Sequence, residues 1–280
     1  MPTILPIIDD CNQNCLFCSA QGRKTNLTQD KIRQIVNKEK DLIVISGGEP
    51  LLSRRLFRIL EYVKKRNLKI ELETNATLLT YNLAKKLLNR GVDLFNINFP
   101  SHTERLTGEI TQSKKSFFPK IEAIKILERL KARIRLTHIV NSLNYLHMEE
   151  MVEFVKENFA SISYIQFSFI KILGNALKFA WINPRYEDVE LPLLKAFIKC
   201  RQLKIDFLVD HIPLCFLPGF ESHHADFRKL KEGIGSKYSL KEKVKLKACS
   251  ACKLEGYCYG VRKDYIELFG EGNILVKPRR

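Results

Sequence analysis

Three cysteines near the N-terminus have the spacing that says most about chemistry. Cys11, Cys15 and Cys18 stand in the run Cys-Asn-Gln-Asn-Cys-Leu-Phe-Cys, with three and then two residues between them. Thiolates are the usual ligands of iron–sulfur clusters, and this short spacing keeps three sulfurs within reach of a single core. Three ligands for four irons leave one iron open, and an open iron can bind a substrate or a cofactor.

Zinc and redox thiols are the alternatives for this segment, which we call the cysteine loop (residues 11–18). Structural zinc prefers four ligands, and no fourth cysteine or histidine lies nearby in the sequence. The chain begins at Met1-Pro2 without a charged and then apolar leader, so we expect a reducing cytoplasm rather than disulfides. The spacing therefore favours an iron–sulfur cluster.

A second motif follows an apolar strand at residues 41–46. It reads Gly47-Gly48-Glu49-Pro50. Glycines let a backbone approach a ligand closely and adopt positive φ, and strand ends are where α/β barrels keep their chemistry. Alone this could be an ordinary turn. About 30 residues after the cysteine loop, with Phe17 before its last cysteine, the pair of motifs resembles the signature of the radical S-adenosylmethionine (SAM) superfamily.

That resemblance implies a cofactor set and a reaction. A four-iron cluster on Cys11, Cys15 and Cys18 would bind SAM at its open iron, and the Gly47–Pro50 turn would hydrogen-bond the amino group of the methionine moiety. One electron from the cluster would cleave the sulfonium bond to methionine and a 5′-deoxyadenosyl radical, which abstracts hydrogen from a substrate carbon. The implied reductant is a flavodoxin or a ferredoxin.

Further cofactor contacts are implied by the same resemblance. Thr74 and Asn75 begin a segment similar to the Thr-Asn-Gly-Thr of the MoaA- and PqqE-like branch, with alanine in place of the glycine. The segment after residue 95 resembles the family pattern Ser-Leu-Asp-Gly-Pro but lacks its acidic residue. Asn98, Ser101 and Asn141 stand where the family places polar contacts to the cofactor. Each could instead be a polar residue at a strand end that meets solvent.

The last 70 residues hold a second set of cysteines: Cys215, Cys249, Cys252 and Cys258. Four thiols can hold a second iron–sulfur cluster or a structural zinc ion. The Cys-x2-Cys-x5-Cys spacing resembles the SPASM and twitch auxiliary domains of the superfamily, although Arg262 stands where a further cysteine usually follows. Four ligands suffice for one cluster, so a twitch-like domain with a second 4Fe-4S cluster is the expectation.

Strand and helix patterns alternate from the start of the chain, which favours parallel strands with helical crossovers. Strands are expected at 3–8, 42–46, 69–73, 92–98, 134–140, 162–170 and 204–209. Helices are expected at about 29–39, 53–66, 80–91, 117–131, 145–158 and 185–203, with a long loop between 98 and 117. Six units and a final strand predict a partial (β/α)6 TIM-type barrel over 1–210, followed by a small, loop-rich auxiliary cluster domain over 211–280.

Other chemistry-capable side chains lie outside these motifs. Asp210 and His211 follow the last expected strand, where they could form a general acid/base pair at the barrel mouth or a structural pair at the domain junction. The remaining residues are expected to be structural, in the core or in a solvated loop: Trp181 and Cys200 in the core, His223 and His224 in the loop.

The composition fits a globular protein with an excess of positive charge. The 280 residues include 47 Lys and Arg against 31 Asp and Glu, a net charge of +16, and 45% are hydrophobic. No apolar run approaches the ~18–20 residues that span a bilayer, so we expect a cytoplasmic protein with no membrane contact. A basic face attracts nucleic acid or other anions, but no RNA-binding motif is present, and solvated lysines such as Lys85-Lys86 are the alternative.

The sequence leaves the substrate open between two classes. A ribosomally made peptide is the first expectation, because the MoaA- and PqqE-like branch is rich in peptide maturases. A small metabolite or cofactor precursor is the alternative, because strand one begins at Thr3 and leaves no room for an added peptide-recognition domain. A non-catalytic iron–sulfur electron carrier or a zinc-bearing nucleic-acid-binding protein would require the Gly47–Pro50 match to be accidental.

Overall fold

The computed structural model describes residues 3–25, 27–233 and 241–278. Its main sheet has seven parallel strands in chain order, each paired with the next. They are β1 (Thr3–Pro6), β2 (Leu42–Ser46), β3 (Lys69–Thr74), β4 (Leu94–Asn98), β5 (Ile134–Val140), β6 (Tyr164–Phe169) and β7 (Phe207–Asp210). Among the described residues, β1 and β7 form no ladder with each other, so the sheet is an open barrel as the sequence predicts.

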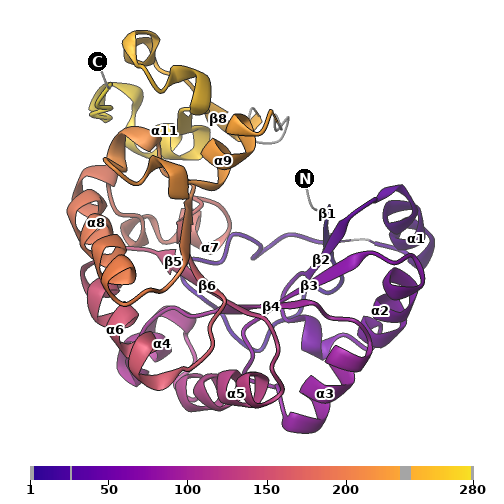
Figure 1. Ribbon diagram of the computed structural model, residues 1–280. Helices are drawn as coiled ribbons and strands as arrows, with labels where there is room; N and C mark the ends of the chain where they lie inside the picture. The colour runs from indigo at the N-terminus through magenta and orange to yellow at the C-terminus, as the bar shows by residue number, and fades with distance from the viewer. Residues whose placement is uncertain (1–2, 26, 234–240, 279–280) are drawn as a thin grey trace.

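Helices cover the outer, convex side of this curved sheet (Figure 1). They are α1 (Gln29–Lys38), α2 (Leu56–Lys65), α3 (Tyr81–Asn89), α4 (Glu104–Thr111), α5 (Phe117–Arg129), α6 (Met148–Asn158) and α8 (Tyr186–Gln202), whereas the short α7 (Asn175–Lys178) lies inside the curve. The hydroxyls of Thr28 and Thr80 accept hydrogen bonds from the first turns of α1 and α3, which fixes where these helices begin.

Helix α4 lies in the stretch for which the sequence predicts a long loop, so that prediction is wrong. The Thr103 hydroxyl accepts a hydrogen bond from the Leu106 amide and caps the helix. Leu106 and Ile110 are buried, and burial against the barrel outweighs the poor helix propensity of threonine and glycine in this segment. The error matters because α4 supports the cysteine loop.

The two faces of the main sheet differ in polarity. In β5, Leu136 and Val140 face the helices and are buried, whereas Arg135 and Thr137 face the concave side and are only partly covered. Strand register places polar residues in neighbouring positions of that concave face: Ser46, Glu71, Glu73, Asn96, Asn98, Arg135, Thr137, Tyr164, Gln166, Ser168 and Asp210. The interior of the open barrel is therefore a polar surface.

The tail is built from short elements after β7. These are α9 (Ala225–Lys231), the two-stranded sheet of β8 (Lys243–Val244) and β9 (Val261–Arg262), α11 (Lys263–Phe269) and several 3₁₀ turns. The turns of the tail are Leu214–Phe216, Glu221–His223, Lys247–Ala251, Glu255–Tyr257 and Glu271–Asn273, and those of the barrel are Pro50–Leu52, Tyr145–His147 and Ala180–Ile182.

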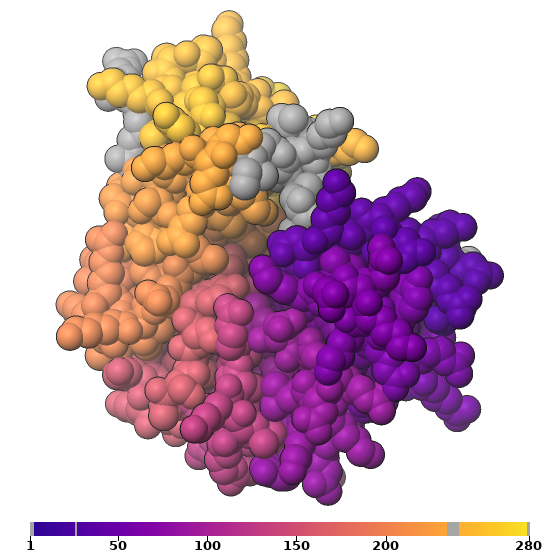
Figure 2. Space-filling view, turned by 45° about the vertical axis from the view of Figure 1, so that its right-hand side comes forward, coloured from indigo at the N-terminus to yellow at the C-terminus, as the bar shows by residue number. Residues whose placement is uncertain are grey.

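The tail shares the apolar core of the barrel. Phe216 and Tyr265 belong to the same buried cluster as the sheet, and Tyr265 stacks on Tyr186 of α8 with ring centres 3.8 Å apart. Figure 2 shows the yellow end of the chain resting on the orange segment that follows β7. The main sheet ends at Asp210, where the sequence predicts the domain boundary, but the apolar core continues across it.

Three expectations about single residues can be compared with burial. Cys200 is fully buried in α8, as expected. Trp181 is 56% exposed, so its prediction as a core residue is wrong: the short turn after α7 directs it outward. The expectation of a solvated His223–His224 pair is also wrong, because His223 stacks on Phe207 and His224 is buried, its ring nitrogen accepting from the Asp226 amide. No helix in the described ranges is both long and apolar enough to cross a membrane.

Candidate functional site

The cysteine loop leaves the end of β1 and is bonded to the end of α4. The Asn14 and Leu16 amides donate to the carbonyls of Thr111 and Ile110, at 3.2 and 2.9 Å. Carbonyls in the last turn of a helix have no partner within the helix, so the loop satisfies two of them. This pairing fixes the part of the loop between Cys11 and Cys18.

A second support comes from the start of α7. The Asn175 side chain donates to the Asn14 side chain at 2.8 Å and to the Cys15 carbonyl at 3.0 Å, while its amide donates to the Cys18 carbonyl at 2.9 Å. Gly174 has φ +59°, and a Cβ there would lie 2.5 Å from the Cys18 carbonyl oxygen. Only glycine allows this close approach, so residues 174 and 175 form a specific support for the loop.

The glycines of the Gly47–Pro50 turn pack against the backbone of residues 8–10, directly before the cysteine loop. A Cβ on Gly47 would lie 2.3 Å from the Ile8 carbonyl oxygen, and one on Gly48 would lie 2.2 Å from that of Asp10. The Gly48 and Glu49 amides donate to these same carbonyls, both at 2.8 Å. In the described chain the two glycines therefore approach the backbone that leads into Cys11.

The three thiols of the cysteine loop lie close enough to affect one another electrostatically. Burial raises the pKa of Cys15 to about 12 and raises that of Cys11, and the neighbouring thiols add to both shifts. Thiols in this setting ionise only when a cation or a metal stabilises the thiolate. Within the described residues, no three His, Cys, Asp or Glu side chains converge on a single metal ion. The three thiols have the donor chemistry that a four-iron cluster needs, and the ligands of such a cluster stand farther apart than those of one ion.

Glu49 is buried and bonded inward, to the end of β3. Its carboxylate accepts from the Thr74 hydroxyl at 2.7 Å, the Asn75 amide at 2.8 Å and the Leu51 amide at 3.0 Å. Burial raises the pKa of Glu49, and these three bonds act in the opposite direction. The carboxylate thus holds the predicted Thr74–Asn75 segment in place instead of pointing at an open surface.

Asn75 connects that segment to the cysteine loop. Its side-chain amide donates to the Asn12 side chain at 2.8 Å and lies 3.9 Å from the Cys11 sulfur. Glu49, Thr74, Asn75 and Cys11 therefore form one chain of contacts, which the sequence motifs predict only as separate cofactor contacts.

Lys120 of α5 is a functional candidate that the sequence reasoning missed. Its ammonium is fully buried and donates to the Asn98 carbonyl at 2.7 Å. Burial lowers its pKa to about 8, while Cys15 and Glu49 lie close enough to oppose that shift. A lysine on an otherwise buried helix face is the signal that could have revealed it, because Lys is almost never fully buried without a partner.

The five remaining residues for which the resemblance predicts cofactor contacts differ in whether they have a polar atom free for a ligand. Ser101 and Asn141 are buried in bonds to their own loops: the Ser101 hydroxyl accepts from the Thr103 amide, and Asn141 bonds Ile139 and Leu143. The Asn98 side-chain oxygen is buried without a partner among the described residues. Phe17 packs against the core and Pro50 begins a 3₁₀ turn. Of these five residues, Asn98 alone offers a buried polar atom for a ligand.

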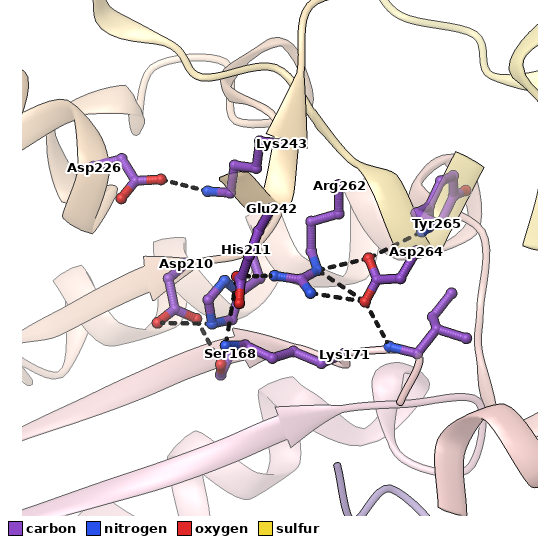
Figure 3. Close-up of polar contacts among 11 residues, drawn as sticks. Ser168, Lys171, Asp210, His211, Asp226, Glu242, Lys243, Arg262, Asp264 and Tyr265 are labelled. Carbon is purple, nitrogen blue, oxygen red and sulfur yellow. Dashed lines mark hydrogen bonds and ion pairs between the residues drawn. The ribbon is translucent and has the colours of Figure 1, made fainter. Parts of the chain in front are cut away.

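Asp210 and His211 lie where β7 meets the tail (Figure 3). Asp210 accepts from the Ser168 hydroxyl of β6 at 2.6 Å. The His211 ring nitrogen is 3.7 Å from the Asp210 carboxylate, which is longer than a hydrogen bond, and its other ring nitrogen is buried without a partner in the described part of the chain. Burial lowers the pKa of His211, so it stands as a neutral imidazole.

The same close-up shows how the tail is anchored to the barrel (Figure 3). The Arg262 guanidinium bonds the carboxylates of Asp264 and Glu242, and Asp264 also accepts from the Ile172 amide after β6 at 3.0 Å. Arg262 and Asp264 are both buried. Arg262 thus holds Asp264, which joins the tail to the segment that follows β6.

The four tail cysteines line one cavity. Cys215, Cys249, Cys252 and Cys258 are among the residues that line it, together with apolar side chains such as Leu214 and Val261. Cys249 and Cys258 lie near enough to Cys215 to raise its pKa, with burial as the main cause. Four thiolates can hold either a four-iron cluster or one zinc ion.

The sequence matches a protein-family model and several known proteins. Residues 5–157, more than half of the chain, match the model of the radical SAM superfamily. A probable GTP 3′,8-cyclase of Methanocaldococcus jannaschii is 28% identical over 177 residues, which cover 58% of this chain and 57% of that protein. An AdoMet-dependent heme synthase of Methanosarcina barkeri is 24% identical over 155 residues, 52% of this chain and 44% of that protein. The chain thus spans about half the length of these relatives.

Solved structures give a similar fold at low identity. SuiB of Streptococcus suis, bound to its precursor peptide SuiA, has a TM-score of 0.70 at 14% identity, over 99% of this chain and 74% of that one. The structure of anSMEcpe with bound AdoMet has a TM-score of 0.65 at 16% identity, over 98% of this chain and 92% of that one. The likeness covers both the barrel and the tail and concerns the fold alone.

Proposed function

The chain belongs to the radical SAM superfamily of enzymes, and from that premise we propose that it cleaves SAM reductively and abstracts hydrogen from a peptide substrate. The observation that carries this proposal is the convergence of the cysteine loop with the Gly47–Pro50 turn, Thr74–Asn75 and Lys120 at one edge of the main sheet. When bound, a four-iron cluster would supply one electron and SAM would supply the 5′-deoxyadenosyl radical.

The described residues would divide the work of positioning. Cys11, Cys15 and Cys18 would hold the cluster, and the contacts of Gly48 and Asn175 would keep the loop in one geometry. Preorganised groups save the entropy and solvent reorganisation that a mobile site would cost at each turnover.

Lys120 would balance negative charge beside the cluster. A buried ammonium near Cys15 forms a charge-assisted hydrogen bond with an anionic partner, and such bonds are roughly twice as strong as neutral ones. The carboxylate of SAM is an anion of the right kind for this position. Glu49 would act as a positioning residue, because its carboxylate fixes Thr74 and Asn75.

The concave face of the sheet would hold the substrate. The charged residues of its strands are Glu71, Glu73 and Asp210 against Arg135, which is paired with Glu71, and Lys171 and Lys243 lie near Asp210 at the mouth. This mixed balance suits a neutral chain of hydrogen-bonding groups, such as a peptide, better than a triphosphate. Asp210 and His211 would border the substrate at the barrel mouth.

A small metabolite is the second candidate, because the curated relatives include probable GTP 3′,8-cyclases. A peptide is preferred on the charge of the concave face. For the tail we propose a second four-iron cluster on its four cysteines, held by a domain over residues 211–280.

Deuterium transfer can separate the two substrate classes. Source cells are grown on deuterated nutrients, and their extract is divided into a peptide fraction and a small-molecule fraction. Each fraction is incubated with reconstituted protein, unlabelled SAM and dithionite, and deuterium in 5′-deoxyadenosine is measured by mass spectrometry. Label from the peptide fraction alone supports the proposal, and label from the small-molecule fraction alone would overturn the peptide assignment.

A further inference from the structure

Gln13 lies inside the cysteine loop and carries a buried donor that makes no hydrogen bond. Its side chain is only 8% exposed, and its Nε2 atom has no partner in the described part of the chain. A buried amide in this state has lost its hydrogen bonds to water and gained none in return. Such groups are rare in proteins, and each one calls for an explanation.

The oxygen of the same carboxamide contacts a thiol. The Cys15 sulfur lies 3.6 Å from Gln13 Oε1 and donates its proton to that oxygen. A thiolate that binds iron has released this proton to solvent, so the bond is lost when Cys15 becomes a cluster ligand. A half-turn of the carboxamide exchanges its oxygen and nitrogen while the shape of the side chain stays the same. The Nε2–H group would then face the sulfur, and both the unpartnered donor and the thiolate would be satisfied.

A second carboxamide already has this orientation at a neighbouring thiol. Asn75 Nδ2 lies 3.9 Å from the Cys11 sulfur, and Asn75 Oδ1 accepts from the amide and the hydroxyl of Thr77 at 3.0 and 2.7 Å. Because both bonds from Thr77 require an acceptor, they fix Asn75 with its N–H side toward the sulfur. Gln13 would reach the same arrangement at Cys15 by its half-turn.

We propose that the Gln13 carboxamide donates to the Cys15 thiolate of the bound cluster and thereby raises the reduction potential of that cluster. Hydrogen bonds to the cysteine sulfurs are among the factors that set such potentials. One-electron reduction adds a negative charge, and a donor at the sulfur stabilises the more negative state better. Gln13 acts through Cys15 and is therefore a positioning residue. The inference rests on the proposed function, since it requires a cluster on the cysteine loop.

The test compares Gln13→Met with Gln21→Met in the reconstituted protein without SAM. Methionine has a similar length and shape to glutamine but no N–H group, and Gln21 is an exposed residue three positions after Cys18. The midpoint potential of the loop cluster is measured by EPR during titration with dithionite, which supplies the electron. A variant without the three loop cysteines identifies the signals that belong to the tail. The melting temperature is recorded for each variant.

We expect Gln13→Met to lower the equilibrium constant for reduction about tenfold, which is a midpoint about 59 mV more negative for one electron. Gln21→Met should keep the wild-type midpoint. A second measurement covers a Gln13→Met protein that assembles no cluster. With nitrogen-15 in the glutamine side chains of wild type, pulsed EPR of the reduced loop cluster should show coupling to nitrogen-15, and its absence would overturn the proposal.

An unchanged midpoint in Gln13→Met, or an equal shift in both variants, would also overturn it. A lower melting temperature with an unchanged midpoint would make Gln13 a purely structural residue of the loop. A midpoint that depends on Gln13, in a protein that does not cleave SAM with dithionite, would support the role of Gln13 and contradict the proposed function alone.

Discussion

The two cysteine sets of this molecule are supported in opposite ways. The cysteine loop is bonded to α4 and α7, and the Gly47–Pro50 turn holds residues 8–10 directly before it, all within the barrel. The tail cysteines line a cavity between short turns and a two-stranded sheet, with few regular elements around them. In the first region the fold positions the thiols, and in the second the thiols and their ligand would position the chain.

Because the two cysteine sets are supported differently, loss of metal should have different consequences in the two regions. A loop held by the barrel can lose its metal and keep its surroundings, because the apolar core of the barrel does not depend on it. The tail has 70 residues, and a single core in a domain below about 70–80 residues rarely supplies more than about 3–5 kcal/mol, so a bound metal would add a large share of its folding free energy. Loss of metal should therefore abolish chemistry in one region and structure in the other.

The largest expected effect follows removal of the loop thiols. Replacing Cys11, Cys15 and Cys18 by Ala should lower the iron content of the reconstituted protein from about eight to about four per chain, the content of one four-iron cluster. Iron analysis and the melting temperature measure the result. A variant that keeps all its iron would show that these thiols are not the ligands, and one that unfolds would contradict the structural independence of the loop.

Replacement of Cys249 and Cys252 by Ala should give the complementary result. About four irons should remain, but the tail should become sensitive to limited proteolysis, because metal binding supplies folding free energy there. A tail that stays resistant would remove the contrast between the regions. One zinc ion per wild-type chain beside about four irons would make the tail a structural zinc site.

A third test concerns the anchor between tail and barrel. Asp264→Ala leaves the buried Arg262 guanidinium without its main partner, and breaking a buried ion pair on one side costs about 3–5 kcal/mol. Glu255→Ala, which removes the exposed pair with Lys245, is the matched control and should cost at most about 1 kcal/mol. Chemical denaturation measures both, and equal losses would show that the buried pair is not an anchor.

The smallest effect is expected at Glu49. Hydrogen bonds to a charged group contribute about 1.5–3 kcal/mol, so loss of the carboxylate that fixes Thr74 and Asn75 should weaken SAM binding about ten- to a hundredfold without loss of iron. Glu49→Gln keeps one acceptor oxygen and should have a smaller effect than Glu49→Ala. Unchanged SAM affinity in both variants would make the Gly47–Pro50 turn purely structural.

Much of the fold can be predicted from local sequence patterns. The residues that contact the cysteine loop from distant parts of the chain cannot. Apolar strand runs and threonine caps predict all seven strands and six of the helices, because each depends on a few adjacent residues. Helix α4 was missed because its stability comes from burial of Leu106 and Ile110 against the barrel. Gly174, Asn175 and Lys120 lie far from the cysteines in sequence, so their contacts with the loop exist only once the barrel has formed.

The motifs also predict which residues lie near the cysteine loop better than they predict what each residue contacts. Gly47 and Gly48 are in the expected place, but they face the backbone of residues 8–10. Glu49 bonds inward to Thr74 and Asn75. Such details depend on which atoms the fold brings within about 3 Å, and spacing along the chain does not contain that information.

The most direct test of the central claim is quantification of 5′-deoxyadenosine and methionine after reconstituted wild-type protein is incubated with SAM and dithionite. Reductive cleavage predicts the two products in equal amounts from wild type and neither from the variant with Cys11, Cys15 and Cys18 replaced by Ala. No cleavage by an iron-loaded wild-type protein, or undiminished cleavage by the variant, would contradict the assignment of the cysteine loop as the reactive centre.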